Sequence, residues 1–366
     1  MFRRAALGFC ALALTSLAAG CRAEPAAAPA ASVPPYAHIL VIVEENKNYE
    51  QIADPATAPQ LAALAARYGA ATEFFSEVHP SEANYVALLG GDTFGIHDDD
   101  WALCKPGKAS SACLFALFPG YVDHTVHAPH LGDQLSAAGL SWKGYYEDLP
   151  APGSLAFLGG DPKAAPEAPR LAFYAAKHSG FVNFASVQND PRRSEHLVGF
   201  DALDADLAAD ALPNFALIVP NQCNEMHGLR GPDLPPGCDA GDIGALIVRG
   251  DKVAADLVRR IQATAAWRSP ANFAIVITFD EGAGGARGGC CAVTPNAPSN
   301  YGGGHIPTIV ITNHGPRGLK DPTPYNHYSL LRTMEDAFGI GVHLRHAADT
   351  DLGVVSMVPL FATPRP

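Results

Sequence analysis

His38-Ile39-Leu40-Val41-Ile42-Val43 is an uninterrupted apolar run, and the polar residues Glu44, Glu45 and Asn46 follow it directly. A continuous apolar run of this length is typical of a parallel strand that is buried on both faces. In sheets built from such strands, ligands bind beyond the carboxyl ends. The stretch therefore predicts the class of fold and marks Glu45 and Asn46 as candidate site residues, with an ordinary Asn46 helix cap as the alternative.

Strand-like and helix-like segments alternate along the rest of the chain. We expect strands near 70–75, 140–146, 214–219, 272–279 and 306–312, and helices near 58–68, 82–89, 240–267 and 325–338. Thr57 and Ser81 are the expected N-caps of the first two helices. Long loops are expected at about 96–128, 148–170, 222–240 and 282–304. This alternation predicts an α/β protein whose mostly parallel sheet is covered by helices on both faces.

Composition and charge restrict the class of function. The chain has 366 residues, of which 48% are hydrophobic and 17% charged, which is a globular composition. Its 25 Lys and Arg against 37 Asp and Glu give a net charge of −12. Because a phosphate backbone attracts basic surfaces, we expect no nucleic-acid partner. No linker is recognised after the first strand begins, so residues 36–366 are expected to form one catalytic domain.

Residues 1–20 have the features of an export signal, with Arg3 and Arg4 before an apolar run. The end of the run, Leu17-Ala18-Ala19-Gly20-Cys21, resembles a bacterial lipobox, which implies cleavage before Cys21 and a lipid on its thiol. An ordinary secretory signal cut near Ala23 is the alternative. Residues 21–35 form a Pro/Ala-rich tether. We therefore expect an exported, periplasmic or cell-surface bacterial lipoprotein that is anchored to the membrane through Cys21.

Export changes the meaning of the cysteines. Without Cys10 and Cys21, six remain, and an even set in an oxidising compartment indicates disulfides with 15 possible connectivities. They are Cys104, Cys113, Cys223, Cys238, Cys290 and Cys291. The first two form the simplest local pair, and the other four could tie two Gly-rich loops together. A zinc cluster is the alternative, which the lack of a CxxC pair disfavours.

Two further strand ends carry candidate catalytic groups. Ser81, in His79-Pro80-Ser81-Glu82-Ala83-Asn84-Tyr85, opens a helix, where backbone N–H groups favour a phosphate beside an attacking hydroxyl. A plain Ser81 cap is the alternative. Asp280 and Glu281 follow the strand at 272–279, and adjacent carboxylates repel each other without a counter-charge. They predict a divalent cation, against the alternative of a solvated acidic turn.

Two loops add histidines to this set. Gly302-Gly303-Gly304-His305 precedes a strand, and Asn224-Glu225-Met226-His227 follows one. An incidental histidine in a flexible loop, or a polar loop pinned by Cys223, is the alternative in each case. A hydroxyl beside a divalent metal suits the hydrolysis of a phosphate ester through a covalent phosphoenzyme. The chain lacks the GxSxG pattern of α/β-hydrolases.

The order of these motifs resembles the bacterial phosphoesterase family of secreted acid phosphatases and phospholipase C-like enzymes, within the alkaline phosphatase superfamily. The matching stretches lie at 41–46, 79–85, 142–150, 174–178, 213–227, 278–281, 302–308 and 327–333. The chain is most similar to secreted acid phosphatases that carry His-Pro-Ser-Glu-x-Asn-Tyr and can act on phosphoinositide monophosphates. The resemblance implies a three-layer α/β/α sandwich with a mostly parallel, alkaline-phosphatase-like sheet.

The resemblance also implies roles for the matched residues. A divalent cation (Mg, Ca, Mn or Zn) would be held by Glu45, Asn46, Ser81, Asp280 and Glu281. Ser81 would also be the nucleophile, and Asn84 would bind a phosphate oxygen. His178, His227 and His305 would contact phosphate, protonate the leaving group or hold a second metal. The family often has Asp before and after the loop histidine, whereas this chain has Glu225 and Gly228 there.

Together these observations predict an exported, metal-assisted phosphomonoesterase of the acid phosphatase type that forms a phosphoserine. Its expected substrates are small phosphate esters or phospholipid headgroups, and the sequence indicates no oligomeric state. A phosphodiesterase or phospholipase C on the same fold is one alternative. A sulfatase or phosphonate hydrolase is another, and the lack of a CxPxR motif disfavours the sulfatase. A non-catalytic, ligand-binding surface lipoprotein is the third.

Overall fold

The computed structural model describes residue 1 and residues 32–362, except 109, 111, 161–170 and 294–300. Ser32–Pro366 is a compact unit by itself. The expected export signal, Cys21 and most of the tether lie outside the described residues. Val33 and Tyr36 are buried, and the Tyr36 hydroxyl donates to the Phe361 carbonyl (2.7 Å). The packed body therefore begins a few residues earlier than the boundary expected at residue 36.

A nine-stranded sheet forms the centre of this unit, in the order β11-β2-β10-β8-β1-β7-β3-β6, with β9 paired to β2. The strands are β1 (His38–Glu44), β2 (Gly69–Val78), β3 (Trp142–Tyr146), β6 (Leu197–Gly199), β7 (Phe215–Val219), β8 (Phe273–Phe279), β9 (Tyr301–His305), β10 (Thr308–Thr312) and β11 (Leu319–Asn326). Only β9 and β10 run against the others, so the prediction of a mostly parallel sheet is confirmed. A separate hairpin pairs β4 (Leu158–Gly160) with β5 (Ala172–Ala175).

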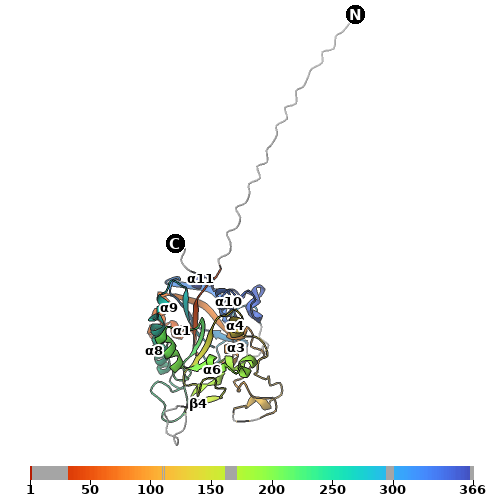
Figure 1. The fold of residues 1–366 in the computed structure, drawn as a ribbon, viewed down its shortest axis with the longest axis vertical. Helices are drawn as coiled ribbons and strands as arrows, with labels where there is room; N and C mark the ends of the chain where they lie inside the picture. Colours follow the sequence, from red (N-terminus) through yellow and green to blue (C-terminus); the bar gives the residue numbers. More distant parts are fainter. Residues whose placement is uncertain (2–31, 109, 111, 161–170, 294–300, 363–366) are drawn as a thin grey trace. The chain divides into compact units, whose positions relative to one another are not determined.

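Helices cover both faces of the sheet (Figure 1), as the three-layer α/β/α prediction requires. One layer holds α1 (Tyr49–Ala53), α2 (Pro59–Arg67), α8 (Ile243–Gln262) and α9 (Ala265–Arg268), with α7 (Phe200–Ala209) joined to α8 by the Arg260–Asp204 ion pair. The other holds α3 (Glu82–Gly90), α4 (Leu131–Ala137) and α10 (His327–Ala337). The remaining α-helices are α5 (Ala185–Asn189), α6 (Arg193–His196) and α11 (Val358–Phe361). Within the described part of the chain, no helix has the length and apolarity that a membrane span requires.

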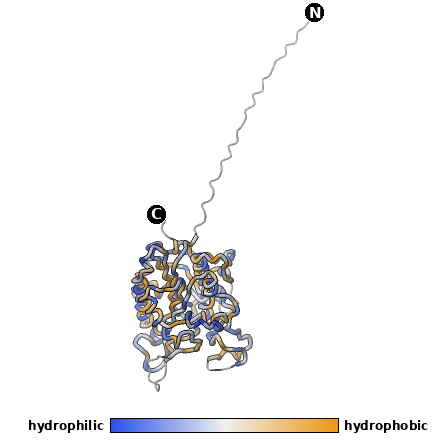
Figure 2. The backbone as a smooth tube through the Cα atoms, viewed as in Figure 1, coloured by the Kyte–Doolittle hydropathy of each residue, from blue (hydrophilic) through white to orange (hydrophobic). Residues whose placement is uncertain are grey.

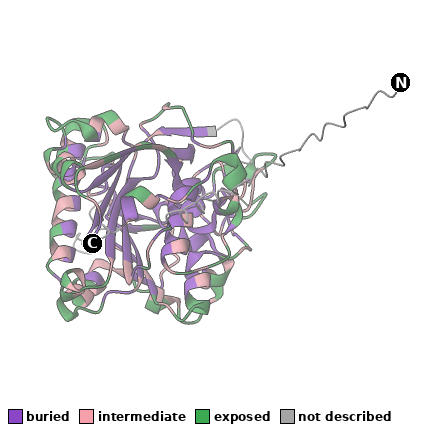
Figure 3. Ribbon diagram, turned by 90° about the horizontal axis from the view of Figure 1, so that it is seen from above, coloured by how far each residue is buried: buried purple, intermediate pink, exposed green. Residues whose placement is uncertain are grey.

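The first apolar run lies at the centre of the core. β1 pairs in parallel with β7 on one side and β8 on the other, and its side chains from Ile39 to Glu44 are buried. Figure 2 shows apolar and polar segments interspersed throughout the body. Figure 3 shows that the central strands are buried, whereas the helices turn exposed faces outward. Because β1, β2, β7 and β8 run in the same direction, their carboxyl ends meet at one edge of the sheet.

Three expected elements differ from the structure. The helix expected at 240–267 is divided into α8 and α9 because Thr264 begins a new helix, accepting from Trp267 N (3.2 Å). The helix expected from residue 325 begins at His327, since Asn326 ends β11 and caps α10. The Gly-rich segment 302–305, expected as a loop, is strand β9. A Cβ on Gly303 would lie 2.0 Å from Ser76 Oγ, so only glycine allows this pairing.

The disulfides follow the expected local pairing in one case only. Cys104–Cys113 is confirmed. The expected link between the two Gly-rich loops is wrong, because Cys223 pairs with Cys238 and Cys290 pairs with Cys291. Each partner is available within the same loop, and closing a short loop costs less chain entropy than joining distant segments. All six of these cysteines are therefore used in disulfides, and none is left as a zinc ligand.

Candidate active site

Strand β1 delivers two candidate ligands to the carboxyl edge of the sheet. Glu45 is buried, and its Oε1 accepts from the Tyr85 hydroxyl (2.7 Å). Asn46 has a left-handed backbone (φ 56°), which asparagine adopts more readily than most residues. This conformation directs the Asn46 amide to Glu45 Oε2 and its N–H to Asp280 Oδ1 (3.0 Å). The residues expected as ligands from β1 and β8 therefore lie together.

Ser81 stands at the N-terminus of α3 but does not use its side chain as a cap. Its hydroxyl is buried and donates instead to Glu45 Oε2 (3.2 Å). Burial raises the pKa values of Asp280 and Glu281, and the nearby Ser81 hydroxyl offsets a small part of that rise. The structure therefore favours the interpretation that the Ser81 hydroxyl belongs to the acidic site over the interpretation that it only caps a helix.

Four buried carboxylates meet at this edge, and we call them the carboxylate cluster: Glu45, Glu225, Asp280 and Glu281. Burial raises the pKa of each one, and the charges of neighbouring carboxylates raise the pKa values of Glu45, Glu225 and Glu281 further. For Glu281, burial and the charge of Asp280 raise the pKa to about 10. Asp280 Oδ2 is buried and has no hydrogen-bond partner among the residues that the structure describes. Glu225 joins from the loop after β7, whose Asn, Glu and His residues the sequence offered as a plausible ligand set.

Two of the three expected histidines reach the cluster. His178 is buried, with Nε2 3.3 Å from Glu45 Oε1 and Nδ1 2.6 Å from Glu225 Oε1. Burial and the nearby charge of Lys177 lower its pKa well below the usual value. His227 Nδ1 lies 2.7 Å from the Gly228 carbonyl, which identifies Nδ1 as the protonated nitrogen. Its Nε2 therefore keeps a lone pair, and burial lowers the pKa of His227 to about 4.

These donors fit a divalent cation. One oxygen of Glu45 and one nitrogen each of His178 and His227 lie within 4.8 Å of one another. Carboxylate oxygens of Asp280 and Glu281 adjoin them across Ser81. A cation would offset the repulsion within the carboxylate cluster and give Asp280 Oδ2 a partner. Oxygen donors suit Mg, Ca or Mn, and the added imidazoles suit Zn or Mn.

Lys177 supplies the positive charge on the half-exposed side of the site. Its Nζ donates to Asp99 Oδ2 (2.9 Å) and lies 3.5 Å from His227 Nε2. Burial opposes its charged form, but Asp99 and Glu45 outweigh burial and raise the pKa of Lys177 above its usual value. Sequence analysis assigned no role to Lys177, Asp99 or Tyr85. Lys177 and Tyr85 lie beside His178 and Asn84 in the matched stretches, and this position is the signal that could have identified them.

Asn84 and His305 have other partners. The Asn84 side chain accepts from the N–H groups of Glu77 and Val78 and donates to the Val78 carbonyl (2.9 Å), so it holds the turn between β2 and α3. His305 lies between Tyr49 and Phe75, and its Nε2 is 2.8 Å from the Thr72 carbonyl. The structure does not bring either side chain into contact with the carboxylate cluster. Their polar atoms are used to position β2 and its neighbours.

Comparison with known proteins shows which proteins this chain is similar to. A phosphatidylinositol-3-phosphatase of Mycobacterium tuberculosis is 30% identical over 330 residues, which cover 90% of this chain and 86% of the relative. An acid phosphatase of Aspergillus fumigatus is 26% identical over 81% of this chain, which spans about half of that protein (53%). The crystal structure of the sulfatase PsFucS1 from Pseudoalteromonas sp. has a TM-score of 0.50 over 90% of this chain and 72% of that one, at 13% identity, which shows the fold alone.

Fold, acidic site and relatives define the class of this protein as a hydrolase of phosphate esters. More particularly, residues 51–341 match the model of the Phosphoesterase family. The chain belongs to the phosphoesterase family, as its motifs predicted.

Proposed function

We propose that this chain is an exported phosphomonoesterase that uses Ser81 as its nucleophile. The observation that carries the proposal is the Ser81 hydroxyl, which donates to Glu45 within a set of buried metal-binding donors instead of capping its helix. The proposed substrates are phosphate monoesters. Phosphoinositide headgroups are the preferred candidates, because the M. tuberculosis relative is a phosphatidylinositol-3-phosphatase. Because that relative aligns over most of both chains, we extend its substrate class to this site.

In the proposed reaction, Ser81 Oγ attacks phosphorus and its proton passes to the carboxylate cluster. The bond from phosphorus to the substrate alcohol breaks, and the proton held by the carboxylate cluster passes through water to the leaving oxygen. Water then hydrolyses the phosphoserine and frees Ser81. A divalent cation held by Glu45, Asn46, Asp280, Glu281 and the two site histidines would lower the pKa of the Ser81 hydroxyl and offset charge on the phosphate.

Lys177 binds the non-bridging phosphate oxygens in this proposal. Its ammonium group is held by Asp99 and lies on the half-exposed side of the site, where a substrate would enter. A fixed positive charge stabilises the extra negative charge of the transition state, because it needs no reorganisation during the reaction. Asn84 and His305 keep the turn and strand that carry Ser81 in place.

The test is turnover of p-nitrophenyl phosphate and of its bis-ester by residues 32–366, from acid to mildly alkaline pH, with and without EDTA. We expect monoester hydrolysis that EDTA abolishes and that Ser81→Ala reduces by several orders of magnitude. Ser329→Ala removes a buried hydroxyl from the first turn of α10 and should keep turnover.

Three outcomes would change the proposal. A folded Ser81→Ala variant with near-normal rates would remove Ser81 as the nucleophile. Preference for the bis-ester would indicate a phosphodiesterase or phospholipase C. No turnover by folded, metal-loaded protein would favour the non-catalytic binding protein.

Export and lipid anchoring are part of the proposal and rest on the sequence of residues 1–21. Mass spectrometry of the protein extracted from cells should find a chain that begins at Cys21 and carries diacylglycerol. A Cys21→Ala variant should appear uncleaved and without the lipid. A mature chain that begins near Ala23 would indicate an ordinary secretory signal instead.

A further inference from the structure

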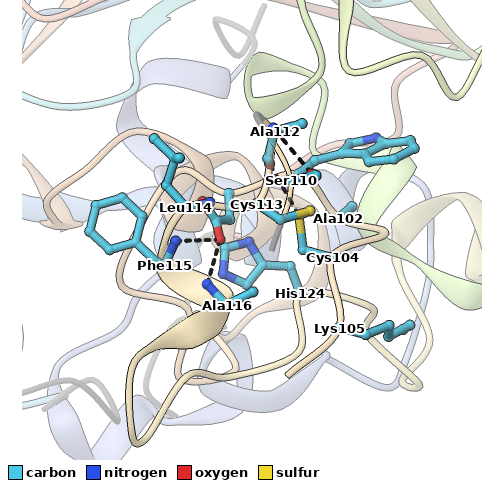
Figure 4. Close-up of a disulfide and its surroundings, with 12 residues drawn as sticks. Ala102, Cys104, Lys105, Ser110, Ala112, Cys113, Leu114, Phe115, Ala116 and His124 are labelled. Carbon is cyan, nitrogen blue, oxygen red and sulfur yellow. Dashed lines mark hydrogen bonds between the residues drawn. A yellow bond between two sulfur atoms is a disulfide. The ribbon is translucent and has the colours of Figure 1, made fainter. Parts of the chain in front are cut away.

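Residues 104–118 form a disulfide-closed loop, which we call the prong (Figure 4). The Cys104–Cys113 bond closes residues 104–113 into a ring, and a short 3₁₀ turn (Phe115–Leu117) follows the second cysteine. In Figure 1 this gold-coloured segment extends from the end of the body where β4 lies. Residues 109 and 111 of the loop are outside the described set and take no part in the argument.

Large apolar side chains of the prong are exposed to solvent. Leu114, Phe115, Leu117 and Phe118 have 65%, 46%, 60% and 63% of their surface exposed. No other five-residue stretch among the described residues holds more than two exposed side chains of this kind. In Figure 4, Leu114 and Phe115 point away from the disulfide. Concentrated apolar exposure of this kind marks a surface that binds a partner or a membrane.

The fold holds this conformation in place. The buried carboxylate of Asp100 accepts from the N–H groups of Leu114 (2.9 Å), Phe115 (2.8 Å) and Ala116 (2.9 Å), and Gly107 N donates to the Ala116 carbonyl (2.7 Å). Together with the disulfide, these bonds fix the backbone on both sides of the exposed side chains. Since exposing apolar surface to water is unfavourable, a loop fixed in this way indicates a contact made outside the chain.

The charge of the prong is opposite to that of the protein. Residues 104–121 contain Lys105 and Lys108 and no acidic residue, in a chain of net charge −12. Both lysines are exposed, and Lys105 is 2.7 Å from Asp123 at the base of the loop. Exposed aromatic and aliphatic side chains beside lysines are the combination that binds the interface of an anionic bilayer. A protein partner would require no such charge reversal.

The base of the prong is built into the active site. His124 lies between Asp98 Oδ1 (3.2 Å) and Glu82 Oε2 (3.0 Å), and Glu82 directly follows Ser81. Asp99, between Asp98 and Asp100, holds Lys177. The segment that exposes the apolar side chains is therefore attached to the residues that position the nucleophile and the proposed phosphate-binding lysine.

From these observations we infer that the prong inserts its apolar side chains into the interface of an anionic lipid bilayer and docks the active site on a membrane. Exposed Lys108 faces the lipid headgroups, whereas Lys105 remains paired with Asp123, and the site beside the prong receives the phosphate of a lipid headgroup. The choice of substrate rests on the proposed function, whereas the docking is independent of Ser81 and is measured without turnover.

The test is co-sedimentation of residues 32–366, which lack the proposed lipid anchor, with vesicles of phosphatidylcholine with or without phosphatidylserine. We expect binding to the anionic vesicles. The Phe115→Ser/Phe118→Ser variant should bind at least about tenfold more weakly, because it lacks the two aromatic side chains that the bilayer would bury. The matched control, Val248→Ser/Val342→Ser, changes two exposed apolar residues elsewhere and should bind like the wild type. Lys108→Glu should weaken binding to anionic vesicles only.

Insertion has its own readout. A tryptophan placed by Phe118→Trp should be quenched by lipids brominated in their acyl chains, and Val342→Trp should not. The inference fails if the wild type does not bind anionic vesicles, if prong and control variants bind equally, or if the prong variant instead abolishes self-association in solution.

Turnover separates this inference from the proposed function. Ser81→Ala should bind vesicles like the wild type. The Phe115→Ser/Phe118→Ser variant should hydrolyse p-nitrophenyl phosphate normally and lose activity on phosphoinositide in vesicles. Vesicle binding without any turnover would overturn the proposed function and support membrane docking. Turnover without vesicle binding would support the proposed function and overturn membrane docking.

Discussion

Lys177 shows how strongly the charge of a buried group depends on its neighbours. Burial favours its neutral form, yet the carboxylates of Asp99 and Glu45 keep it charged. Its ammonium group therefore remains available to an incoming phosphate over a wide pH range. Lys47, by contrast, is occupied by the carbonyl oxygens of Glu45, Asn46 and Met226.

Lys177→Met should lower kcat/KM for p-nitrophenyl phosphate about 100-fold, which is typical of removing one fixed group that stabilises transition-state charge. Lys143→Met removes a lysine that pairs with Asp206 away from the site and should leave kcat/KM unchanged. Steady-state kinetics, with thermal unfolding as a check on folding, measures both. A folded Lys177→Met variant with wild-type kcat/KM would contradict the role.

His130 gives a stability prediction that is independent of the active site. It caps α4 and is packed among Trp142, Phe181 and Phe184, and burial lowers its pKa from the usual 6.5 to about 4. Because the folded pKa is depressed, the unfolded chain binds the proton more tightly. Neutral His130 therefore contributes up to about 3 kcal/mol to the free energy of unfolding. This contribution is complete above pH 6.5 and is lost as the pH falls towards 4.

The measurement is the free energy of unfolding in urea between pH 4 and pH 7. The stability difference between the wild type and His130→Asn, which retains a capping side chain, should grow as the pH rises over this range, because the buried carboxyl groups titrate alike in both proteins. A difference that does not change with pH would show that His130 makes no pH-dependent contribution.

Helix α2 illustrates how one helix depends on another. The sequence favoured Thr57 as its N-cap, but α2 begins at Pro59 with Ala58 in the cap position. The buried carboxylate of Asp251, in the middle of α8, accepts from Leu61 N (2.8 Å) and Gln60 N (3.1 Å). The cap is thus supplied by a side chain 190 residues further along the chain, a contact that no local pattern indicates.

Asp251→Ala should lower the free energy of unfolding by about 2 kcal/mol, because it removes a cap and leaves two buried N–H groups without a partner. Asp256→Ala, on the exposed face of the same helix, should change it by less than about 0.5 kcal/mol. Chemical denaturation measures both. Equal effects of the two substitutions would show that the Asp251 contact adds nothing.

Charge balance links the site to the stability of the protein. The carboxylate cluster gathers four acids from β1, from the loop after β7 and from the end of β8, so their repulsion opposes the packing of the central strands. A bound cation stabilises the folded state by mass action, about 2.7 kcal/mol at 100 times Kd.

EDTA should therefore lower the melting temperature of the metal-loaded protein by about 4 °C. Asp280→Asn removes one charge from the cluster, so in EDTA it should melt above the wild type and should respond less to added metal. Differential scanning calorimetry measures both. An unchanged melting temperature on chelation, with a destabilised Asp280→Asn variant, would exclude the proposed metal site.

Much of this architecture could be predicted from local patterns. Continuous apolar runs such as 38–43 and 273–279 are typical of buried parallel strands. The polar residues that follow such strands lie at the carboxyl edge of the sheet. Glu45, Asn46, Ser81, Asp280 and the family were therefore accessible from the sequence. Strand β9 was not, because glycines in a row are typical of loops and become a strand only where Ser76 leaves no room for a side chain.

The sequence by itself determined the parallel core, the place of the site at its edge and the membership of the phosphoesterase family, since these depend on periodicity and on motif order. Tertiary structure alone decided which polar groups meet. In the folded chain the Ser81 hydroxyl binds Glu45, and the Asn84 side chain binds backbone groups instead of substrate. His305 lies between two aromatic rings, away from the site. Lys177 and Glu225 are brought to the site from distant segments. The reason is that a side chain's partners depend on distances between segments far apart in the chain, which local sequence does not encode.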